Sequence, residues 1–321
     1  MIRYRFLVCL FVCGAFAHAV PSRPQPRLVA MTFDDLPVAP ADDPADAAAI
    51  IHAILRGLDR YHAPAIGFVI GKRVEAAGEG EGTRLLQDWV RRGYDLGNHT
   101  YSHLDLNNIS ANRYERDVIS DDSFIAPLMA AAGRHVRYFR FPYNHTGDTP
   151  EKHAALAAFL AGRGYTVAPC TIDNEDSIFD QAYIAALRAK DTRSIHEIQA
   201  AYLDYTSVEI DYYASVHKQI FGREIPHVML LHANKLNAGL IDNVLKVFEQ
   251  KHYRFVSLAT AMSDPAYATP DTFVTQFGWM WAYRWAKELG VKVNGNLESE
   301  PPGWIKQYAG NAASKIPAPP Q

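Results

Sequence analysis

The chain has 321 residues, a formal net charge of −3, 48% hydrophobic residues and 21% charged residues. This composition is typical of a globular protein and excludes a largely disordered chain. Without a net positive charge or a long run of Lys and Arg, the sequence gives no electrostatic reason to expect nucleic acid as a partner. The length is sufficient for one large α/β domain.

The N-terminus has the pattern of a secretory signal peptide. Arg3 and Arg5 precede an apolar stretch over 6–16, and Ala17-His18-Ala19 follows it as a small-x-small cleavage pattern. The apolar stretch is shorter than the roughly 20 residues that cross a bilayer. We therefore expect residues 1–19 to be removed on export to the periplasm or the medium, with no stable membrane insertion. Two of the three cysteines lie in this segment, so no disulfide can form within the mature chain.

After a Pro-rich lead, apolar segments alternate between strand-like and helix-like periodicity, which indicates βα units around a mainly parallel sheet. The expected strands cover residues 28–33, 65–70, 94–96, 138–141, 165–171, 228–231 and 253–257. The expected helices begin at Asp43-Pro44, Thr83, Ser110 and Thr149, and at about residues 178, 240 and 277. The helical stretch 178–221 is longer than one crossover requires, so we interpret it as an insertion.

Asp34 and Asp35 stand side by side after the first expected strand. Paired acids at the end of a buried strand are costly unless a cation or a proton offsets them. Neighbouring residues on a strand face opposite ways, so both can serve one site only where the backbone leaves the strand. The alternative is a helix cap or a solvated turn. The pair is expected at the carboxyl end of the strand, where α/β enzymes carry their chemistry.

His99 and His103 are four residues apart after the third expected strand and would share one face if the segment were helical. In a chain with 13 histidines, such a pair is equally compatible with two structural imidazoles. At a strand end, however, both can point into the same mouth of the sheet as the Asp pair. One Asp with two His leaves a fourth position for water, as in a catalytic zinc site. The second Asp can then act as general base.

Three further polar residues follow later strand ends. Arg140 can hold a carboxylate in a bidentate pair, or can be a strand-edge Arg paired at the surface. Asp176 can orient His232, which can then protonate a leaving group; a buried, hydrogen-bonded imidazole is the alternative. Convergence of the strand ends is what favours the catalytic interpretation.

These residues form an ordered series of motifs: Thr32-Phe33-Asp34-Asp35, His99-x-x-x-His103, Arg140-x-Pro142-Tyr143, Asp173-x-x-Asp176 and Leu230-x-His232. The series resembles the five motifs of the polysaccharide deacetylase family, the carbohydrate esterases of family four, over about residues 28–260. The resemblance implies a distorted (β/α) barrel with fewer than eight complete strands and zinc-dependent removal of acetyl groups from acetylated carbohydrate. We expect the barrel over 20–267, with the insertion at about 178–221, and a helical C-terminal extension and tail over 268–321.

The resemblance assigns the metal site and the base. By motif, Asp35, His99 and His103 would be the ligands of a divalent metal, with Zn2+ as the expected ion. Asp34 would be the general base.

The resemblance also assigns the groups around the base. Arg140 would hold Asp34, and the backbone N–H of Tyr143 would stabilise the oxyanion. His232 would be the general acid, and Asp176 would tune it.

Two positions depart from the family pattern. Ser177 stands where the family usually has Trp after the fourth motif, and Leu36-Pro37 replaces the usual Gly-Pro after the paired Asp. The first change removes one apolar wall of the usual substrate groove. Candidates to replace it are the Trp residues at 279, 281 and 285, although Trp at this spacing is more often part of a core.

The sequence thus predicts an exported, metal-dependent deacetylase of an acetylated carbohydrate, with the acetyl group on nitrogen or oxygen. One alternative is hydrolysis of non-sugar linear or cyclic amides on the same fold, which Ser177 favours. Another is a carbohydrate-binding protein without activity, against which the intact base and acid argue. The oligomeric state stays open.

Overall fold

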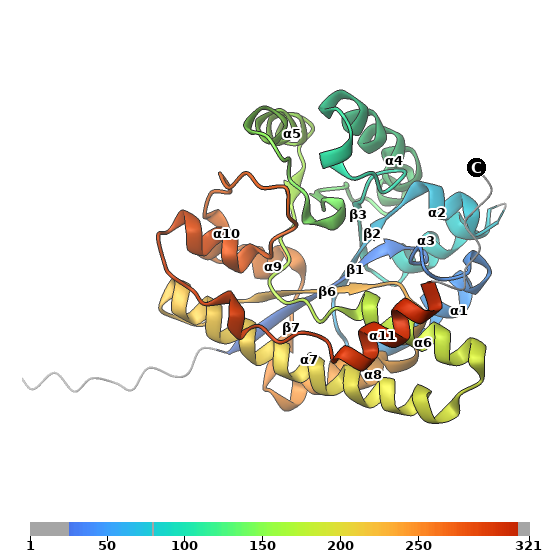
Figure 1. Ribbon diagram of the computed structural model, residues 1–321. Helices are drawn as coiled ribbons and strands as arrows, with labels where there is room; N and C mark the ends of the chain where they lie inside the picture. Colours follow the sequence, from blue (N-terminus) through green and yellow to red (C-terminus); the bar gives the residue numbers. More distant parts are fainter. Residues whose placement is uncertain (1–25, 79, 314–321) are drawn as a thin grey trace, which may run out of the picture.

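The computed structural model describes residues 26–313, apart from residue 79 (Figure 1). The expected signal peptide over 1–19 lies outside the described residues. Within them, no helix is both long and apolar enough to cross a membrane.

A seven-stranded parallel sheet forms the centre of the molecule, in the order β5-β4-β3-β2-β1-β6, with β7 also paired to β1. The strands are β1 (Arg27–Leu36), β2 (Ala65–Val69), β3 (Asp95–Asn98), β4 (Tyr138–Phe139), β5 (Thr166–Val167), β6 (His227–His232) and β7 (Tyr253–Phe255). The longest strand, β1, is buried from Val29 to Leu36 and lies between β2 and β6. Its strong burial explains why a short apolar run predicted it correctly.

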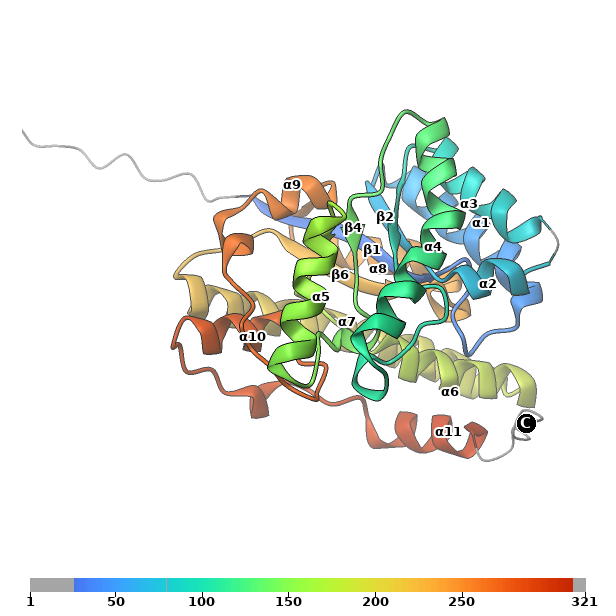
Figure 2. The same cartoon turned by 90° about the horizontal axis from the view of Figure 1, so that it is seen from above.

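Helices surround this sheet (Figures 1 and 2). They are α1 (Ala47–Arg60), α2 (Gly71–Ala76), α3 (Glu81–Arg91), α4 (Ala111–Ala131), α5 (Pro150–Gly162), α6 (Asp176–Ala189), α7 (Thr192–Phe221), α8 (Lys235–Gln250), α9 (Leu258–Met262), α10 (Trp281–Glu288) and α11 (Gly303–Ala313). The stretch interpreted as an insertion is occupied by α6 and α7. Figure 2 shows α11 alongside α6, while α10 packs on α7.

The barrel is closed by a segment without regular strand structure, residues 168–172. After the two-residue strand β5, the Ala168 N–H donates to the Phe139 carbonyl at 2.8 Å, on the β4 side. Four residues later Ile172 bridges to Met229 of β6. The chain therefore crosses from one edge of the sheet to the other, and the predicted distorted barrel with fewer than eight complete strands is confirmed.

A small apolar cluster joins three strands of the sheet to α9. It combines side chains of β1, β2 and β6 with Ala168 and two residues of α9, and its members are Ala30, Ile66, Phe68, Ala168, Val228, Leu258 and Ala261. Side chains alternate along a strand, so Thr32 and Asp34 follow Ala30 on the same face of β1. The polar side chains are thus gathered at the carboxyl end of β1.

Three predicted helix starts were wrong, two for a local reason and one because of a contact between distant residues. Thr83 is not a cap, because α3 begins at Glu81 after left-handed Gly80. Helix α8 begins at Lys235 rather than near 240, because the Asn234 side chain caps it. The last expected helix begins at Trp281 rather than 277, since Gly278 lies so close to the Tyr143 carbonyl that a Cβ would be 1.9 Å from its oxygen.

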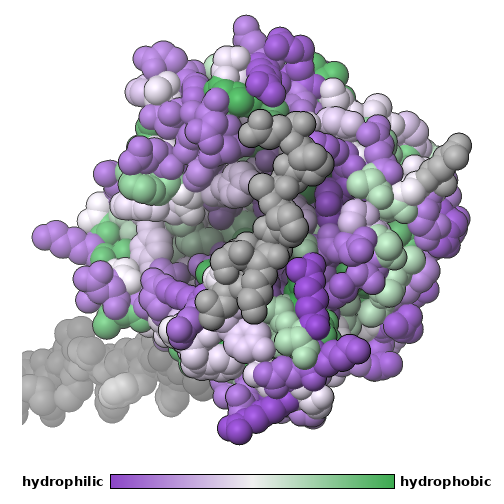
Figure 3. Space-filling view, turned by 45° about the vertical axis from the view of Figure 1, so that its right-hand side comes forward, coloured by the Kyte–Doolittle hydropathy of each residue, from purple (hydrophilic) through white to green (hydrophobic). Residues whose placement is uncertain are grey.

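The surface in the view of Figure 3 is largely hydrophilic around a central hollow, whose floor carries paler and more hydrophobic side chains.

Candidate active site

A bulge at the end of β1 brings both acids into one site. The register against β2 shifts between Phe33 and Leu36, and Asp35 has a φ of 65°. Such a bulge adds a residue to one strand and re-aims the side chains beside it. Asp34 and Asp35 are both nearly buried, 4% and 5% exposed. The expectation that the backbone must leave regular strand geometry here is confirmed.

Asp35, His99 and His103 come together, with their potential ligand atoms within 4.8 Å of one another. The two imidazoles are not on a helix, contrary to the conditional expectation. The Asn98 side chain accepts the Thr100 N–H at 2.9 Å, and the Asp117 side chain accepts the Ser102 N–H at 2.8 Å. These side-chain bonds replace those of a helix, so a loop presents both rings.

His99 is fixed with one ring nitrogen free. Its Nδ1 lies 2.8 Å from the Arg140 carbonyl, to which it donates, so Nε2 carries the lone pair on the side of Asp35. The ring is 2% exposed, and burial together with the nearby His103 lowers the pKa of His99 to about 3. The imidazole is therefore neutral, as a metal ligand must be.

The three residues fit a divalent metal such as zinc. Asp35 Oδ1 lies 3.5 Å from Nε2 of both His99 and His103, too far for a hydrogen bond. Ligand atoms of a tetrahedral zinc site, with bonds of about 2.0–2.2 Å, lie roughly 3.3–3.6 Å apart. Among the described residues Asp35 Oδ1 is buried without a hydrogen-bond partner, which is costly unless a cation pairs with it.

The neighbouring Asp34 is held by a buried cation. Arg140 is 1% exposed, and its Nη1 donates to Asp34 Oδ1 and to Thr32 Oγ1, both at 2.7 Å. Its guanidinium also stacks on Phe68, 4.3 Å from the ring centre. The other Asp34 oxygen, Oδ2, lies 3.7 Å from His99 Nε2. Arg140 therefore fixes one oxygen of Asp34 and leaves the second beside the predicted metal site.

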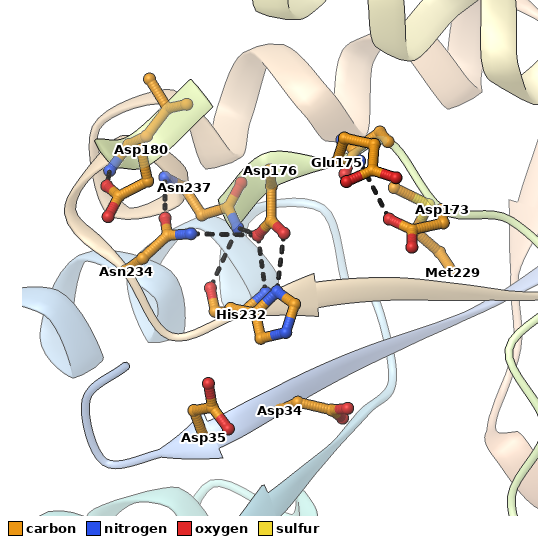
Figure 4. Close-up of polar contacts among 12 residues, drawn as sticks. Asp34, Asp35, Asp173, Glu175, Asp176, Asp180, Met229, His232, Asn234 and Asn237 are labelled. Atoms are coloured by element: carbon orange, nitrogen blue, oxygen red, sulfur yellow. Dashed lines mark hydrogen bonds and ion pairs between the residues drawn. The ribbon is translucent and has the colours of Figure 1, made fainter. Parts of the chain in front are cut away.

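His232 and Asp176 form a second polar group, facing the acids from β6 and the first turn of α6 (Figure 4). The His232 Nδ1–H donates to Asp176 Oδ1 at 2.6 Å, and the His232 backbone N–H donates to Oδ2 at 2.8 Å. The side chains of Asn234 and Asn237 also donate to Oδ2. The imidazole is thereby held with Nε2 free.

The pairing sets the charge of both members. Burial opposes protonation of His232, but the Asp176 carboxylate outweighs it, so the pKa of His232 is raised well above its usual value. Burial likewise disfavours an ionised Asp176, yet His232 and the surrounding donors hold the pKa of that carboxyl below its usual value. The pairing therefore favours an imidazolium beside a carboxylate.

Tyr143 completes the rim of the site. Its backbone is left-handed, with a φ of 59°, and its ring is 56% exposed and packs edge-on against His103 with centres 4.6 Å apart. Asp35, His103 and Glu175 also have positive φ. Non-glycine residues reach this conformation at a cost, and such strain gathers where the surrounding structure enforces a functional geometry.

All these groups meet at one cleft of about 410 Å³. The two acids, both metal-site histidines, Tyr143 and His232 line it, while Arg140 and Asp176 lie behind Asp34 and His232. Ser177 also lines the cleft. Trp281 and Trp285 are core residues, 8% and 1% exposed, so they do not replace the missing wall.

The sequence reasoning missed the two asparagines that hold Asp176. Asn234 caps α8 and Asn237 lies one turn later. An Asn two residues after the strand-end His232 is a typical helix N-cap, and this signal was present in the sequence. Thr32, which accepts from Arg140 and donates to the Met229 carbonyl at 2.6 Å, was identified only as part of a motif.

Comparison with known proteins agrees with the family that the sequence motifs resemble. Residues 22–161 match the family model described as polysaccharide deacetylase. The chain is 32% identical over 133 residues to a chitooligosaccharide deacetylase of Sinorhizobium fredii, covering 40% of this chain and 54% of the relative. It is 28% identical over 133 residues to a peptidoglycan-N-acetylglucosamine deacetylase of Bacillus cereus, covering 41% of this chain and 54% of the relative. The chain thus spans about half the length of these curated relatives.

The fold has solved counterparts. A CE4 family pseudoenzyme from Bacillus anthracis superposes with a TM-score of 0.51 at 14% identity, over 75% of this chain and 66% of that one. A mutant of a CE4 family pseudoenzyme, described as having restored activity, gives the same score at 16% identity, over 75% and 69% of the two chains. This likeness establishes the fold alone. The match to the polysaccharide deacetylase family model over residues 22–161 agrees with this fold, and over that part the chain is similar to the family.

Proposed function

We propose that this protein is a metal-dependent hydrolase that removes acetyl groups from an acetylated carbohydrate. One observation carries the proposal: the Asp35, His99 and His103 group and the His232–Asp176 pair line a single cleft. The first group suits a cation and the second suits proton donation.

A divalent cation held by Asp35, His99 and His103, with Zn2+ as the proposed ion, would polarise the acetyl carbonyl and make a water molecule more acidic. Asp34 would accept the proton of the attacking water through Oδ2, since Arg140 occupies Oδ1. The strained turn at Tyr143 would present its backbone N–H to the developing oxyanion.

His232 would protonate the leaving nitrogen or oxygen through Nε2. Its Nδ1 is bonded to Asp176, which holds the ring in one orientation and favours the charged form. Proton donation by a positioned group typically contributes about 10²–10⁴-fold to the rate. The base and the acid thus stand on different strands, β1 and β6, across one substrate position.

The proposed substrate is a glycan that carries N-acetylated sugars. Both relatives described above are named as deacetylases of amino-sugar glycans. The match covers only part of their length, so the substrate of this chain is inferred from shared motifs rather than from the whole proteins.

Acetate release tests the proposal directly. Purified protein loaded with Zn2+ should release acetate from at least one of chitooligosaccharides, peptidoglycan fragments and acetylated xylan, and chelation followed by return of Zn2+ should abolish and restore the activity. Simple linear and cyclic amides belong in the same assay. Hydrolysis of those amides alone would replace the proposed substrate class, and bound metal without hydrolysis of any acyl substrate would refute the reaction.

We also propose export, on the N-terminal pattern over 1–19. Mature protein recovered from the periplasm or medium should begin near residue 20. Intact protein retained in the cytoplasm would contradict this.

A further inference from the structure

A second cavity, of about 730 Å³, lies beside the active-site cleft. Asp173 and Gly278 line both, so the two hollows are neighbours. The walls of the second cavity come from α7, from α10 and from the chain between α10 and α11. Its volume is within the range of about 300–1,000 Å³ that is usual for small-molecule sites.

Trp279 provides an exposed aromatic wall in this cavity. Its side chain is 42% exposed, yet it is packed on one side by Phe273, with ring centres 4.9 Å apart. A large aromatic side chain that is held in place and left partly uncovered offers apolar contact area at little entropic cost. Of Trp279, Trp281 and Trp285, only Trp279 is available to a ligand, because the other two are buried.

Acidic groups also line this cavity. Asp173 and Glu175 line the cavity from the segment directly before α6, whose first residue is Asp176. Burial and neighbouring acids raise the pKa of Asp173 to about 6 and that of Glu175 to about 8. Near neutral pH the two groups can therefore supply both acceptors and a donor, as the hydroxyl groups of a sugar require.

The cavity is fixed relative to the metal site. Gly278 packs directly on the carbonyl of Tyr143, whose ring packs on His103. The Asn107 side chain donates to the Gln276 carbonyl at 2.8 Å. The segment that carries Trp279 is thus held against the loop that carries Tyr143, which fixes the second cavity beside the cleft.

We propose that this second cavity is a binding subsite for a sugar unit that adjoins the one losing its acetyl group, with Trp279 packing against the sugar ring and Asp173 and Glu175 bonding its hydroxyls. The proposal rests on the proposed function. It places part of the substrate specificity in the C-terminal segment, where no catalytic motif lies. The enzyme then selects oligomers over single acetylated sugars.

Substrate length tests the subsite. Acetate release is measured as kcat/KM for one to five units in two series, chitooligosaccharides and acetylated xylo-oligosaccharides, with 4-nitrophenyl acetate as a substrate too small to reach the second cavity. For the wild type, kcat/KM should rise with length. Trp279→Ala should lower it about three- to tenfold for the oligomers that reach the subsite, the range expected for loss of one aromatic contact. It should leave 4-nitrophenyl acetate unchanged.

Trp304→Ala is the matched control. Trp304 is also 42% exposed but lies on α11 and lines neither cavity. It should leave every substrate unchanged. Equal loss in both Trp variants would show a general effect on the fold and overturn the subsite.

Two outcomes separate the subsite from the reaction. Acetate release with the same length profile in wild type and Trp279→Ala overturns the subsite and leaves the proposed function standing. No acetate release from either series or from peptidoglycan fragments overturns the proposed function. In that case calorimetry with the five-unit chitooligosaccharide decides the subsite, because binding that Trp279→Ala weakens three- to tenfold supports it, and equal or absent binding refutes it.

Discussion

Two His–Asp groups face each other across the cleft, and they differ in how their carboxylates are satisfied. Asp35 lies 3.5 Å from the nearest nitrogen of His99 and of His103, and its Oδ1 has no hydrogen-bond partner in the described part of the chain. Asp176 lies 2.6 Å from His232. It also accepts from the backbone of His232 and from two asparagine side chains.

The contrast separates a metal ligand from an orienting group. A buried carboxylate without donors is costly by itself and becomes favourable only with a cation. A carboxylate surrounded by donors needs no metal, and its charge instead stabilises a protonated imidazole. The same pair of residue types thus serves two tasks, and the number of neighbouring donors decides which.

The largest expected effect comes from removing a ligand of the proposed metal site, Asp35 with His99 and His103. Asp35→Ala should abolish stoichiometric Zn2+ binding and all acetate release, because it removes the one anionic ligand. Asp34→Asn should retain Zn2+ and lose about 10²–10⁴-fold in kcat, as expected for loss of a general base. Metal content by mass spectrometry and kcat on the same samples check both.

A thermal control belongs with this pair. Asp34→Asn leaves Arg140 without its anionic partner, so some loss of stability is expected. Zn2+ should nevertheless raise the Tm of Asp34→Asn, as a ligand of the native state does, and should not raise that of Asp35→Ala. Equal loss of metal by both variants would contradict the division of roles.

The His232–Asp176 pair should affect the rate only for substrates whose leaving group needs a proton. His232→Asn should lower kcat about 10²–10⁴-fold for an N-acetyl sugar, whose amine leaves poorly without protonation. For 4-nitrophenyl acetate, whose leaving group is stable as an anion, the loss should be at most a few-fold. Equal losses on the two substrates would argue against His232 as the acid.

Asp176 should determine the pH range of that acid. Burial alone would lower the pKa of His232, and the Asp176 carboxylate is the strongest of the groups that raise it, ahead of Asp35 and Asp34. The donor is the protonated form, so activity should be present below the raised pKa and should fall as pH rises through it. In Asp176→Asn only the more weakly acting Asp35 and Asp34 still oppose burial, so the alkaline limb of the kcat profile should move to lower pH. If the alkaline limb does not move, it reports the titration of a group other than His232.

The sequence predicted the residues of both groups, but not the geometry that distinguishes them. Asp34, Asp35 and His232 lie at ends of buried strands, and such ends are readable from short apolar runs. The bulge at Asp35 was required by the argument that two adjacent acids serve one site. The loop at 99–103 was not foreseen, because side chains from α4 and the end of β3 compete with helix formation there.

The structure of the C-terminal part was less predictable because it depends on contacts between distant residues. The expected helix over 277–289 starts late since Gly278 meets Tyr143, 135 positions away along the chain. No local pattern encodes that contact. The same contact joins the second cavity to the cleft, so its link to the site was not readable from motifs.

The smallest expected effect tests whether the donors around Asp176 are the cause of the contrast. Asn237→Ala removes side-chain bonds to Asp176 and to the His232 carbonyl, and leaves the Tyr202 hydroxyl without the acceptor it now uses. Buried groups left unpaired cost about 1–3 kcal/mol, measurable as the free energy of unfolding in urea. Because His232 and Asp176 remain paired, kcat should fall only a few-fold. Asn108→Ala, which removes an exposed bond to Asp105, should change stability by no more than about 0.5 kcal/mol. Equal effects of the two variants would mean that the buried donors contribute nothing beyond an ordinary surface hydrogen bond, and that the Asp176–His232 contact alone holds the imidazole.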